Sequence, residues 1–205
     1  MEFDIGAEAR CTDGSAGKVV ALIADPVAKA LAHIAVEPED QPGNARVVPV
    51  DLVTASDAAG VELRCSLDEL TRLPDFREVE FVPYLPDSGD LGATFALPYY
   101  SLPELERPIL VDRVPAGEVG IRRHEHVHAA DGAIGQVEGL VVDGESHITH
   151  VLLQAGHMWG RKEVAIPVGS LDRIDADGIH VQLSKSEIAN LPELGVDPPW
   201  RREPG

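Results

Sequence analysis

The residues best suited to chemistry are three histidines at alternate positions, His124, His126 and His128. If this segment is a β-strand, its two-residue period points all three imidazoles to one face. Imidazoles on one face can bind Zn²⁺ or Ni²⁺. The competing interpretation is an ordinary polar face exposed to water, so the sequence offers a candidate metal site with that surface as its alternative.

Three further histidines, His147, His150 and His157, lie in the same half and could complete such a site if the fold brings them close. The alternative is a structural role. His150, like His33 in the first half, stands at the start of an apolar run, where an imidazole can hydrogen-bond within the fold. The sequence favours that role. A histidine-rich face would also titrate near neutral pH, which no feature of the sequence tests.

The segment from Gly156 to Lys162 is the other place where residue types favour contact with a partner. Methionine, tryptophan and arginine are enriched where proteins touch each other. The partner-binding candidates are His157, Met158, Trp159, Arg161 and Lys162. Packing of Trp159 onto its own domain is an equally good interpretation.

No arrangement of residues matches a catalytic motif. The sequence has no Gly-x-Ser-x-Gly elbow, no phosphate-binding glycine loop and no His-Glu-x-x-His pair. The acidic residues Glu37, Glu39 and Asp40 lie in a proline-containing segment and are typical of a solvated turn. We therefore expect no catalytic residues and a protein that is not an enzyme.

An internal repeat indicates how these residues are positioned, and it fixes the expected domain count. The following pairs align at a shift of 118 residues: Asp13-Gly14 with Asp131-Gly132, Pro49-Val50 with Pro167-Val168, and Leu73-Pro74 with Leu191-Pro192. The repeat predicts a first domain at 1–76, a connector at 77–120, a second domain at 121–195 and a tail at 196–205. The positions that match the three alternating histidines are Gly6, Glu8 and Arg10, which favours an exposed polar face over a shared metal site.

The two cysteines, Cys11 and Cys65, are too few for a disulfide framework and match neither zinc nor redox spacing. Their counterparts in the second domain are Ala129 and Leu183. Because these counterparts are apolar, the sequence predicts buried, unreactive thiols rather than a redox pair.

Each domain is predicted to consist of short strands closed by one helix. The predicted strands are 19–24, 32–36, 46–50 and 61–65, with 137–142, 150–153, 164–168 and 179–183 in the second domain. Such closely spaced strands indicate a small barrel or sandwich. The turn glycines Gly14, Gly17, Gly132 and Gly135 can adopt positive φ. Two capping boxes, Ser66 with Glu69 and Ser184 with Glu187, predict the helix starts.

The segment from Pro74 to Gly120, which contains the connector and the residues just before it, carries seven of the 16 prolines and six of the nine aromatic residues. The aromatic residues are Phe76, Phe81, Tyr84, Phe95, Tyr99 and Tyr100. Disordered linkers are poor in aromatic residues. We therefore expect an ordered connector that crosses both domains and buries these rings.

Turn, strand and cap residues of the second domain form one extended pattern. It runs through Ala130-Asp-Gly-Ala-Ile-Gly-Gln-Val137, Val142-Asp143, Ile148-Thr-His-Val-Leu-Leu153, Val164-Ala-Ile-Pro167 and Ser184-x-x-Glu187. This pattern resembles the PRC-barrel family, which includes the cytoplasmic domain of the photosynthetic reaction centre H subunit and the C-terminal domain of a ribosome-maturation factor. The resemblance covers both domains. It implies a mainly β protein with two small barrels in tandem, each closed by a short C-terminal helix, and docking onto other proteins without common catalytic residues.

Composition limits the partners of the protein. With 35 acidic against 17 basic residues and a net charge of −18, the mean field repels a phosphate backbone, so direct nucleic-acid binding is not expected. The start of the chain lacks a basic leader, and the apolar region 19–36 is interrupted by Asp25, Pro26 and Lys29. We therefore expect neither a secretory signal nor a membrane-spanning helix, and a cytoplasmic location.

These observations predict a non-enzymatic protein-binding or assembly module, an adaptor built from two barrels. The alternative is a protein that binds a metal or a small ligand, with a sensory role, through its histidine-rich second domain. The sequence leaves open the identity of the protein partner and whether the chain forms a homo-oligomer.

Overall fold

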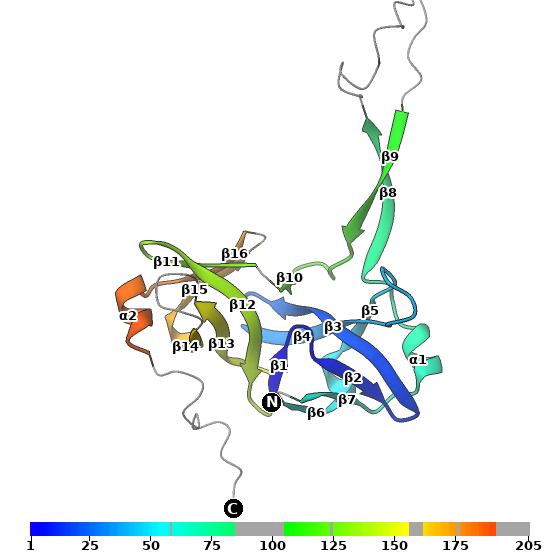
Figure 1. The fold of residues 1–205 in the computed structure, drawn as a ribbon, viewed down its shortest axis with the longest axis horizontal. Coiled ribbons are helices and arrows are strands. Elements are labelled where there is room, and N and C mark those ends of the chain that lie inside the picture. The colour runs from blue at the N-terminus through cyan, green and yellow to red at the C-terminus, as the bar shows by residue number, and fades with distance from the viewer. Residues whose placement is uncertain (58, 85–104, 124, 156–161, 176, 192–205) are drawn as a thin grey trace, which may run out of the picture. The chain divides into compact units, whose positions relative to one another are not determined.

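Strands dominate the structure, as the sequence indicates. The computed structural model describes the chain except residues 58, 85–104, 124, 156–161, 176 and 192–205 (Figure 1). The chain divides into two units. One contains Met1–Phe76 with Val114–Gly205, and the other is Arg77–Arg113.

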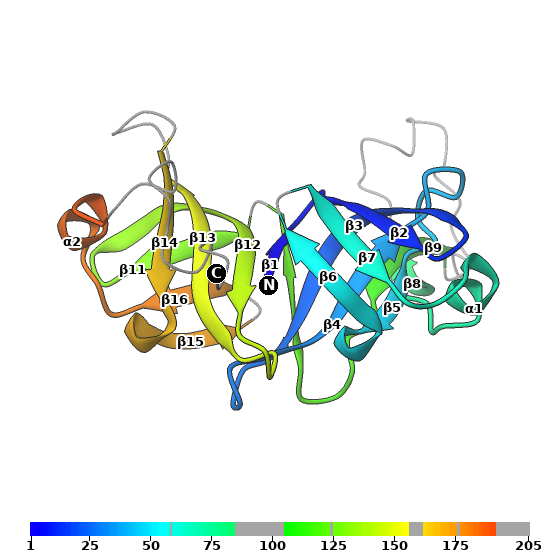
Figure 2. The same ribbon diagram turned by 90° about the horizontal axis from the view of Figure 1, so that it is seen from below.

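The larger unit contains two seven-stranded sheets that are both strongly curled (Figure 2). Six strands of each sheet follow one another in order, and the seventh, described below, pairs with the long strand. The first has the strand order β5 (Arg46–Pro49), β4 (Ala30–Glu37), β3 (Gly14–Asp25), β2 (Glu8–Cys11), β7 (Gly60–Leu63), β6 (Val53–Asp57). The second has the order β14 (Lys162–Pro167), β13 (Ile148–Ala155), β12 (Gly132–Val142), β11 (His126–Ala129), β16 (Gly178–Val181), β15 (Leu171–Asp175). The two orders correspond strand for strand, which agrees with the internal repeat.

The pairing pattern is also repeated. The pairs β2–β7 and β11–β16 are parallel, whereas the other neighbours in both strand orders are antiparallel. A short 3₁₀ helix follows the fifth strand of each half, η1 (Val50–Leu52) and η2 (Val168–Ser170). The helices α1 (Leu67–Thr71) and α2 (Lys185–Ala189) follow β7 and β16.

Both short helices begin with the capping box expected from the sequence. The Ser66 side chain accepts a hydrogen bond from the Glu69 backbone N–H at 3.2 Å, and the Ser66 backbone N–H donates to the Glu69 carboxylate at 2.8 Å. Ser184 and Glu187 form the same pair of bonds at 3.4 and 2.9 Å. These bonds satisfy amide groups that the first helical turn leaves without an intrahelical acceptor.

The turn glycines differ between the two halves. Gly17 (φ 113°) and Gly132 (φ 118°) adopt positive φ, whereas the equivalent Gly135 and Gly14 do not. A Cβ at position 17 would lie 2.1 Å from the Glu37 carbonyl oxygen. Gly17 is therefore required both by its backbone conformation and by the close approach of the next strand.

The leading strand of each half pairs with the long strand of the other half. Strand β1 (Glu2–Asp4) pairs with β12, and β10 (Val119–Arg122) pairs with β3. The registers are equivalent, because Phe3 lies opposite Leu140 and Ile121 lies opposite Leu22. Each sheet is thus completed by a strand from the other half.

A second reciprocal contact joins the turns that precede β4 and β13. The Leu31 backbone N–H donates to the Ser146 carbonyl at 2.9 Å, and the Ile148 N–H donates to the Lys29 carbonyl at 2.8 Å. Lys29 (φ 51°) and Ser146 (φ 65°) are the two non-glycine residues with positive φ in the described part of the chain. Their equivalent positions show that the repeat extends to the conformation of individual turn residues.

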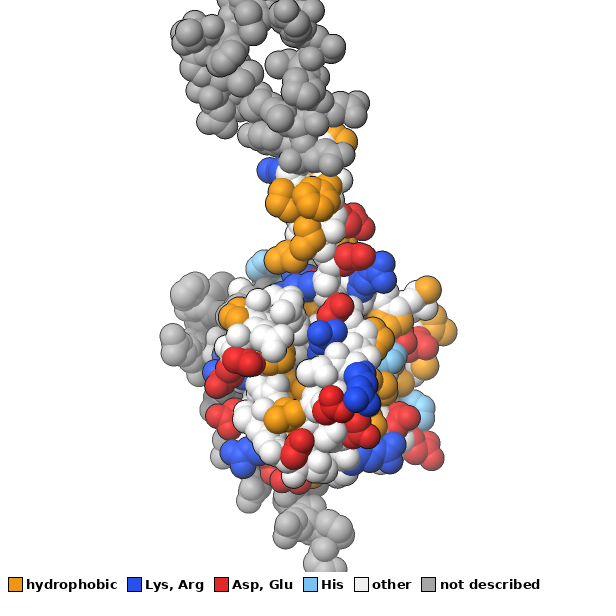
Figure 3. Space-filling view, turned by 90° about the vertical axis from the view of Figure 1, so that its right-hand side faces the viewer, with side chains coloured by type: hydrophobic (Ala, Val, Ile, Leu, Met, Phe, Trp, Pro, Cys, Tyr) orange, Lys and Arg blue, Asp and Glu red, His pale blue; other side chains and the backbone are white. Residues whose placement is uncertain are grey.

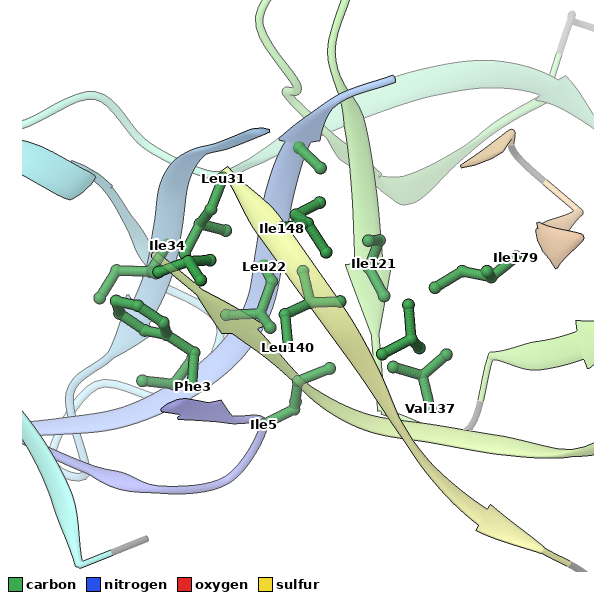
Figure 4. Close-up of a cluster of buried hydrophobic side chains, with 14 of the residues drawn as sticks. Phe3, Ile5, Leu22, Leu31, Ile34, Ile121, Val137, Leu140, Ile148 and Ile179 are labelled. Carbon is green, nitrogen blue, oxygen red and sulfur yellow. The ribbon is translucent and has the colours of Figure 1, made fainter. Parts of the chain in front are cut away.

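The hydrophobic core is continuous across both halves. Phe3, Leu22, Ile121 and Leu140 are fully buried and belong to one cluster (Figure 4). Two smaller clusters lie outside it, one around Ile23 and Phe76 and one formed by Val141, Leu152 and Ala165. The two repeats therefore share a core through their exchanged strands, rather than each burying a separate one.

The smaller unit is a β-hairpin of β8 (Arg77–Tyr84) and β9 (Leu105–Asp112). The connector was expected to be ordered and to bury its rings. The described part of it includes this hairpin, but the predicted burial is wrong for Phe81, which is 63% exposed. Phe76, at the end of the larger unit, is fully buried. The side chain of Tyr84 and the residues Phe95, Tyr99 and Tyr100 lie outside the described part of the structure.

Candidate functional site

The histidine-rich face of the second sheet is formed by β11 and β16. His126 and His128 lie on β11 with buried Val127 between them, so their side chains share a face as predicted. His180 of β16 stacks on His128, with ring centroids 4.8 Å apart and planes 15° apart. His180 comes from a strand more than 50 residues away and was not singled out in the sequence. Its signal was the match of Gly178-Ile-His-Val with Gly60-Val-Glu-Leu in the repeat.

The side chains of this face form ion pairs and hydrogen bonds with neighbouring residues of the same half. The Arg173 guanidinium donates to Asp175 at 2.6 Å, which lowers the pKa of the Asp175 carboxyl. The same carboxylate lies 3.2 Å from Nε2 of His180. His128 Nε2 lies 3.3 Å from the Asp177 carbonyl oxygen. The imidazoles of His128 and His180 thus already have partners within the larger unit, as expected of a structured polar surface.

The predicted metal cluster is only partly described. His124 lies outside the described residues, and within the residues that the structure does place, no three His, Cys, Asp or Glu side chains are arranged to hold a metal ion. His147 lies in the turn after β12, 3.5 Å from Asp143. His150 lies on β13, where burial lowers its pKa. The structure therefore places His180 beside His126 and His128, whereas His147 and His150 lie elsewhere.

The structural role expected for His33 and His150 agrees with their contacts. His33 Nδ1 lies 2.9 Å from the Glu118 carboxylate, and both side chains are largely buried. His150 Nδ1 lies 3.2 Å from the Thr149 hydroxyl. Both imidazoles thus have partners within the larger unit.

The equivalent face of the first sheet has a different composition. Glu8 and Arg10 replace His126 and His128, and Glu62 replaces His180. These side chains line a depression of about 190 Å³. That volume lies below the roughly 300–1,000 Å³ typical of small-molecule pockets. The depression is therefore too small to indicate a cofactor site.

The cysteine pair was expected to be buried, and this is confirmed for both thiols. Cys11 ends β2 and Cys65 follows β7, and their sulfur atoms lie 3.8 Å apart. Burial, with the hydrogen bond to Cys65, raises the pKa of the Cys11 thiol to about 12. Cys11 is therefore protonated at neutral pH and a poor nucleophile.

Most of the predicted contact loop lies outside the described residues, namely His157, Met158, Trp159 and Arg161. Lys162 is the first residue of β14 and pairs with Ala155. The loop therefore remains a sequence prediction for partner binding.

The hairpin carries an apolar surface that sequence reasoning missed. Val79 lies opposite Leu110, and Phe81 lies opposite Pro108, so all four side chains share one face. Val79, Phe81 and Leu110 are 50%, 63% and 61% exposed, and Pro108 is exposed as well. We call these four residues the ribbon patch, and Figure 3 shows apolar side chains gathered along the hairpin. Its signal was the alternation of Glu78 and Glu80 with apolar neighbours, which is typical of a strand.

Comparison with known proteins adds no assignment. No protein-family model matches the chain, and no curated protein matches it. None of the helices in the described part of the chain has the length and apolar character needed to span a bilayer.

Proposed function

We propose that this chain is a tandem PRC-barrel protein that binds and assembles other proteins. The identical strand order of the two sheets supports a duplicated barrel, and so do the two capped helices that follow them. The residues that match between the repeats, such as Phe3 and Ile121, serve packing and turn geometry. No enzymatic activity is part of the proposal.

The ribbon patch is the observation that carries this proposal. An isolated two-stranded hairpin is marginally stable in water, and this one exposes a phenylalanine and a leucine side by side. Burial of a large apolar side chain is worth about 1.5–3 kcal/mol. Contiguous exposed apolar residues mark contact sites for other proteins. A partner that covers the patch would recover this free energy.

The charge of the chain supports protein partners over nucleic acid. A net charge of −18 opposes the approach of phosphate and favours that of basic protein surfaces. The proposed adaptor therefore acts on protein partners, and its proposed location is the cytoplasm.

The experiment compares partners captured from an extract of the source cells by the wild type and by a Phe81→Ser, Leu110→Ser double variant. Chemical crosslinking followed by mass spectrometry identifies the captured proteins and the contact positions. We expect proteins crosslinked near β8 and β9 to be reduced at least about tenfold in the variant, since two hot-spot contacts are lost.

Val27→Ser is the matched control, because Val27 is 91% exposed but stands alone on a turn. This control should capture the same proteins as the wild type. If the double variant captures the same proteins as the wild type, the hairpin is not the binding surface and the proposal is wrong.

A further inference from the structure

The edges of the hairpin differ in their capacity to accept another strand. In the described residues β8 pairs only with β9, so each strand has an outer edge along which no other described strand pairs. Free edges present backbone N–H and C=O groups that can pair with an additional chain. The inference that follows rests on the protein-binding role proposed above. The two edges indicate which kind of segment a partner protein would add to the hairpin.

The prolines indicate which backbone groups point outward. Pro83 lies opposite Glu106, and Pro108 lies opposite Phe81, so both prolines belong to the same alternate set of residue pairs. Because proline has no N–H to donate, it is placed in non-hydrogen-bonded pairs, whose backbone groups face away from the ladder. The outward groups of β8 then belong to Arg77, Val79 and Phe81.

Proline blocks one edge and leaves the other open. Pro108 lies in the middle of β9, where it removes an outward donor from that edge. On β8 the only proline is Pro83, near the end of the strand. Val79 and Phe81 therefore keep their outward donors and acceptors.

The charges on β8 disfavour a second copy of this strand paired about Val79. Glu78 and Glu80 are exposed on the face opposite the ribbon patch. Two antiparallel copies of β8 paired about Val79 would set Glu78 of one against Glu80 of the other, and like charges directly opposite destabilise a sheet. Glu78 also forms an ion pair with Arg113 within the hairpin. The two carboxylates instead complement lysine or arginine.

We propose that the outer edge of β8, at Val79 and Phe81, binds an extended segment of a partner protein in which apolar and basic residues alternate. The segment adds a third strand, pairing with the backbone of Val79 and Phe81. Its apolar side chains extend the ribbon patch, and its lysine or arginine side chains face Glu78 and Glu80. Strand addition of this kind takes affinity from the main chain and specificity from alternate side chains. The net charge of −18 attracts such a basic segment.

The test uses the full-length protein and a fluorescent peptide of alternating valine and lysine, seven residues long, in an anisotropy titration. The key variant is Val79→Pro, which removes one outward N–H while leaving the ladder with β9 intact. Val79→Thr is its matched control, because it has nearly the same shape and keeps the N–H. We expect Kd to rise at least about tenfold in Val79→Pro and less than about twofold in Val79→Thr.

Two further experiments do not depend on the Val79→Pro substitution. Glu80→Lys should weaken binding of the lysine peptide by about threefold or more at low salt, and the same peptide with glutamate for lysine should not bind the wild type. A lysine peptide N-methylated at its valines cannot form the ladder and should not bind. Circular dichroism and the unfolding midpoint establish that each variant is folded.

Equal affinity of Val79→Pro and Val79→Thr, or of the lysine and glutamate peptides, would overturn the inference. Absence of binding by the lysine peptide to the wild type would do so as well. The protein-binding role has its own readout, the partners lost with Phe81→Ser and Leu110→Ser. If those partners are lost while Val79→Pro still captures them, the role stands and strand addition is wrong.

Discussion

The outer faces of β2–β7 and β11–β16 have the same backbone arrangement but different side chains. At equivalent positions the first face has Glu8, Arg10 and Glu62, and the second has His126, His128 and His180. The residues between them remain apolar and buried, Ala9 and Val61 in one sheet and Val127 and Ile179 in the other. The inward residues therefore fix the parallel pairing, and the outward residues were free to diverge.

Only the second of these two faces contains imidazoles. The first face contains an exposed ion pair, Arg10 to Glu8 at 3.3 Å, which is worth little in water. The comparison indicates that the repeat preserves a scaffold and that any specific chemistry belongs to one copy.

The largest expected effect comes from the exchanged strands. Phe3→Ala should lower the free energy of unfolding by about 3–5 kcal/mol, and the equivalent Ile121→Ala by about 2–5 kcal/mol. Because the core is continuous, hydrogen exchange of amides in β4 and β13 should accelerate together in both variants. If exchange accelerates in only one sheet, the two halves unfold independently, and the claim of a shared core is wrong.

A smaller penalty is expected at the glycines beneath the two faces. A Cβ at Gly60 (φ 156°) would lie 2.6 Å from the Glu8 carbonyl oxygen, and one at Gly178 (φ 123°) would lie 2.2 Å from that of His126. Alanine at either position should cost about 1–3 kcal/mol, measured by urea unfolding. Gly169→Ala is the control, because its Cβ meets nothing within 4 Å. A neutral Gly178→Ala would show that the backbones of the two sheets differ.

The helix caps should contribute equally in both halves. Ser66→Ala and Ser184→Ala should each cost about 1 kcal/mol in thermal unfolding, since each loses the acceptor for a helical N–H. Serine to threonine at the same positions keeps the oxygen and serves as the control. A large difference between the two alanine variants would contradict equivalent caps.

The same caps predict a dependence on acid. Hydrogen bonds from the Ser66 and Ser184 backbones lower the pKa of Glu69 and Glu187 in the folded protein. The stabilisation is therefore complete above the unfolded pKa, about 4.3, and is lost as pH falls through the lowered folded pKa. Glu69→Gln should remove part of the stability loss below about pH 4. An identical acid profile for this variant and the wild type would contradict the role of the carboxylate.

The smallest effect is expected from zinc. Since His128 and His180 already contact Asp177 and Asp175, we expect calorimetry with zinc chloride to give the same heat for the wild type and His126→Ala. Binding by the wild type that His126→Ala abolishes would instead establish the metal site that the alternating histidines suggested. It would also make the difference between the two faces a functional one.

The sequence by itself determined the duplication, most strand positions and both helix caps. Pairs such as Ser66 with Glu69 are readable because their bonds span three residues, and turn glycines and strand periodicity are equally local. The predicted strand 19–24 was shorter than the observed β3, because long pairing with β4 and β10 extends it to Gly14–Asp25. The hairpin was missed because the prolines of the connector concealed the alternation of β8.

Only the tertiary structure decided which distant residues meet. Phe3 opposite Leu140, the stack of His180 on His128 and the 3.8 Å contact of Cys11 with Cys65 all join residues more than 50 positions apart. Local propensity has no information on such contacts, because they depend on the free energy of packing two sheets around one core. The exchange of β1 and β10 follows from the same cause, since each leading strand finds its apolar partners and its free backbone edge in the other half.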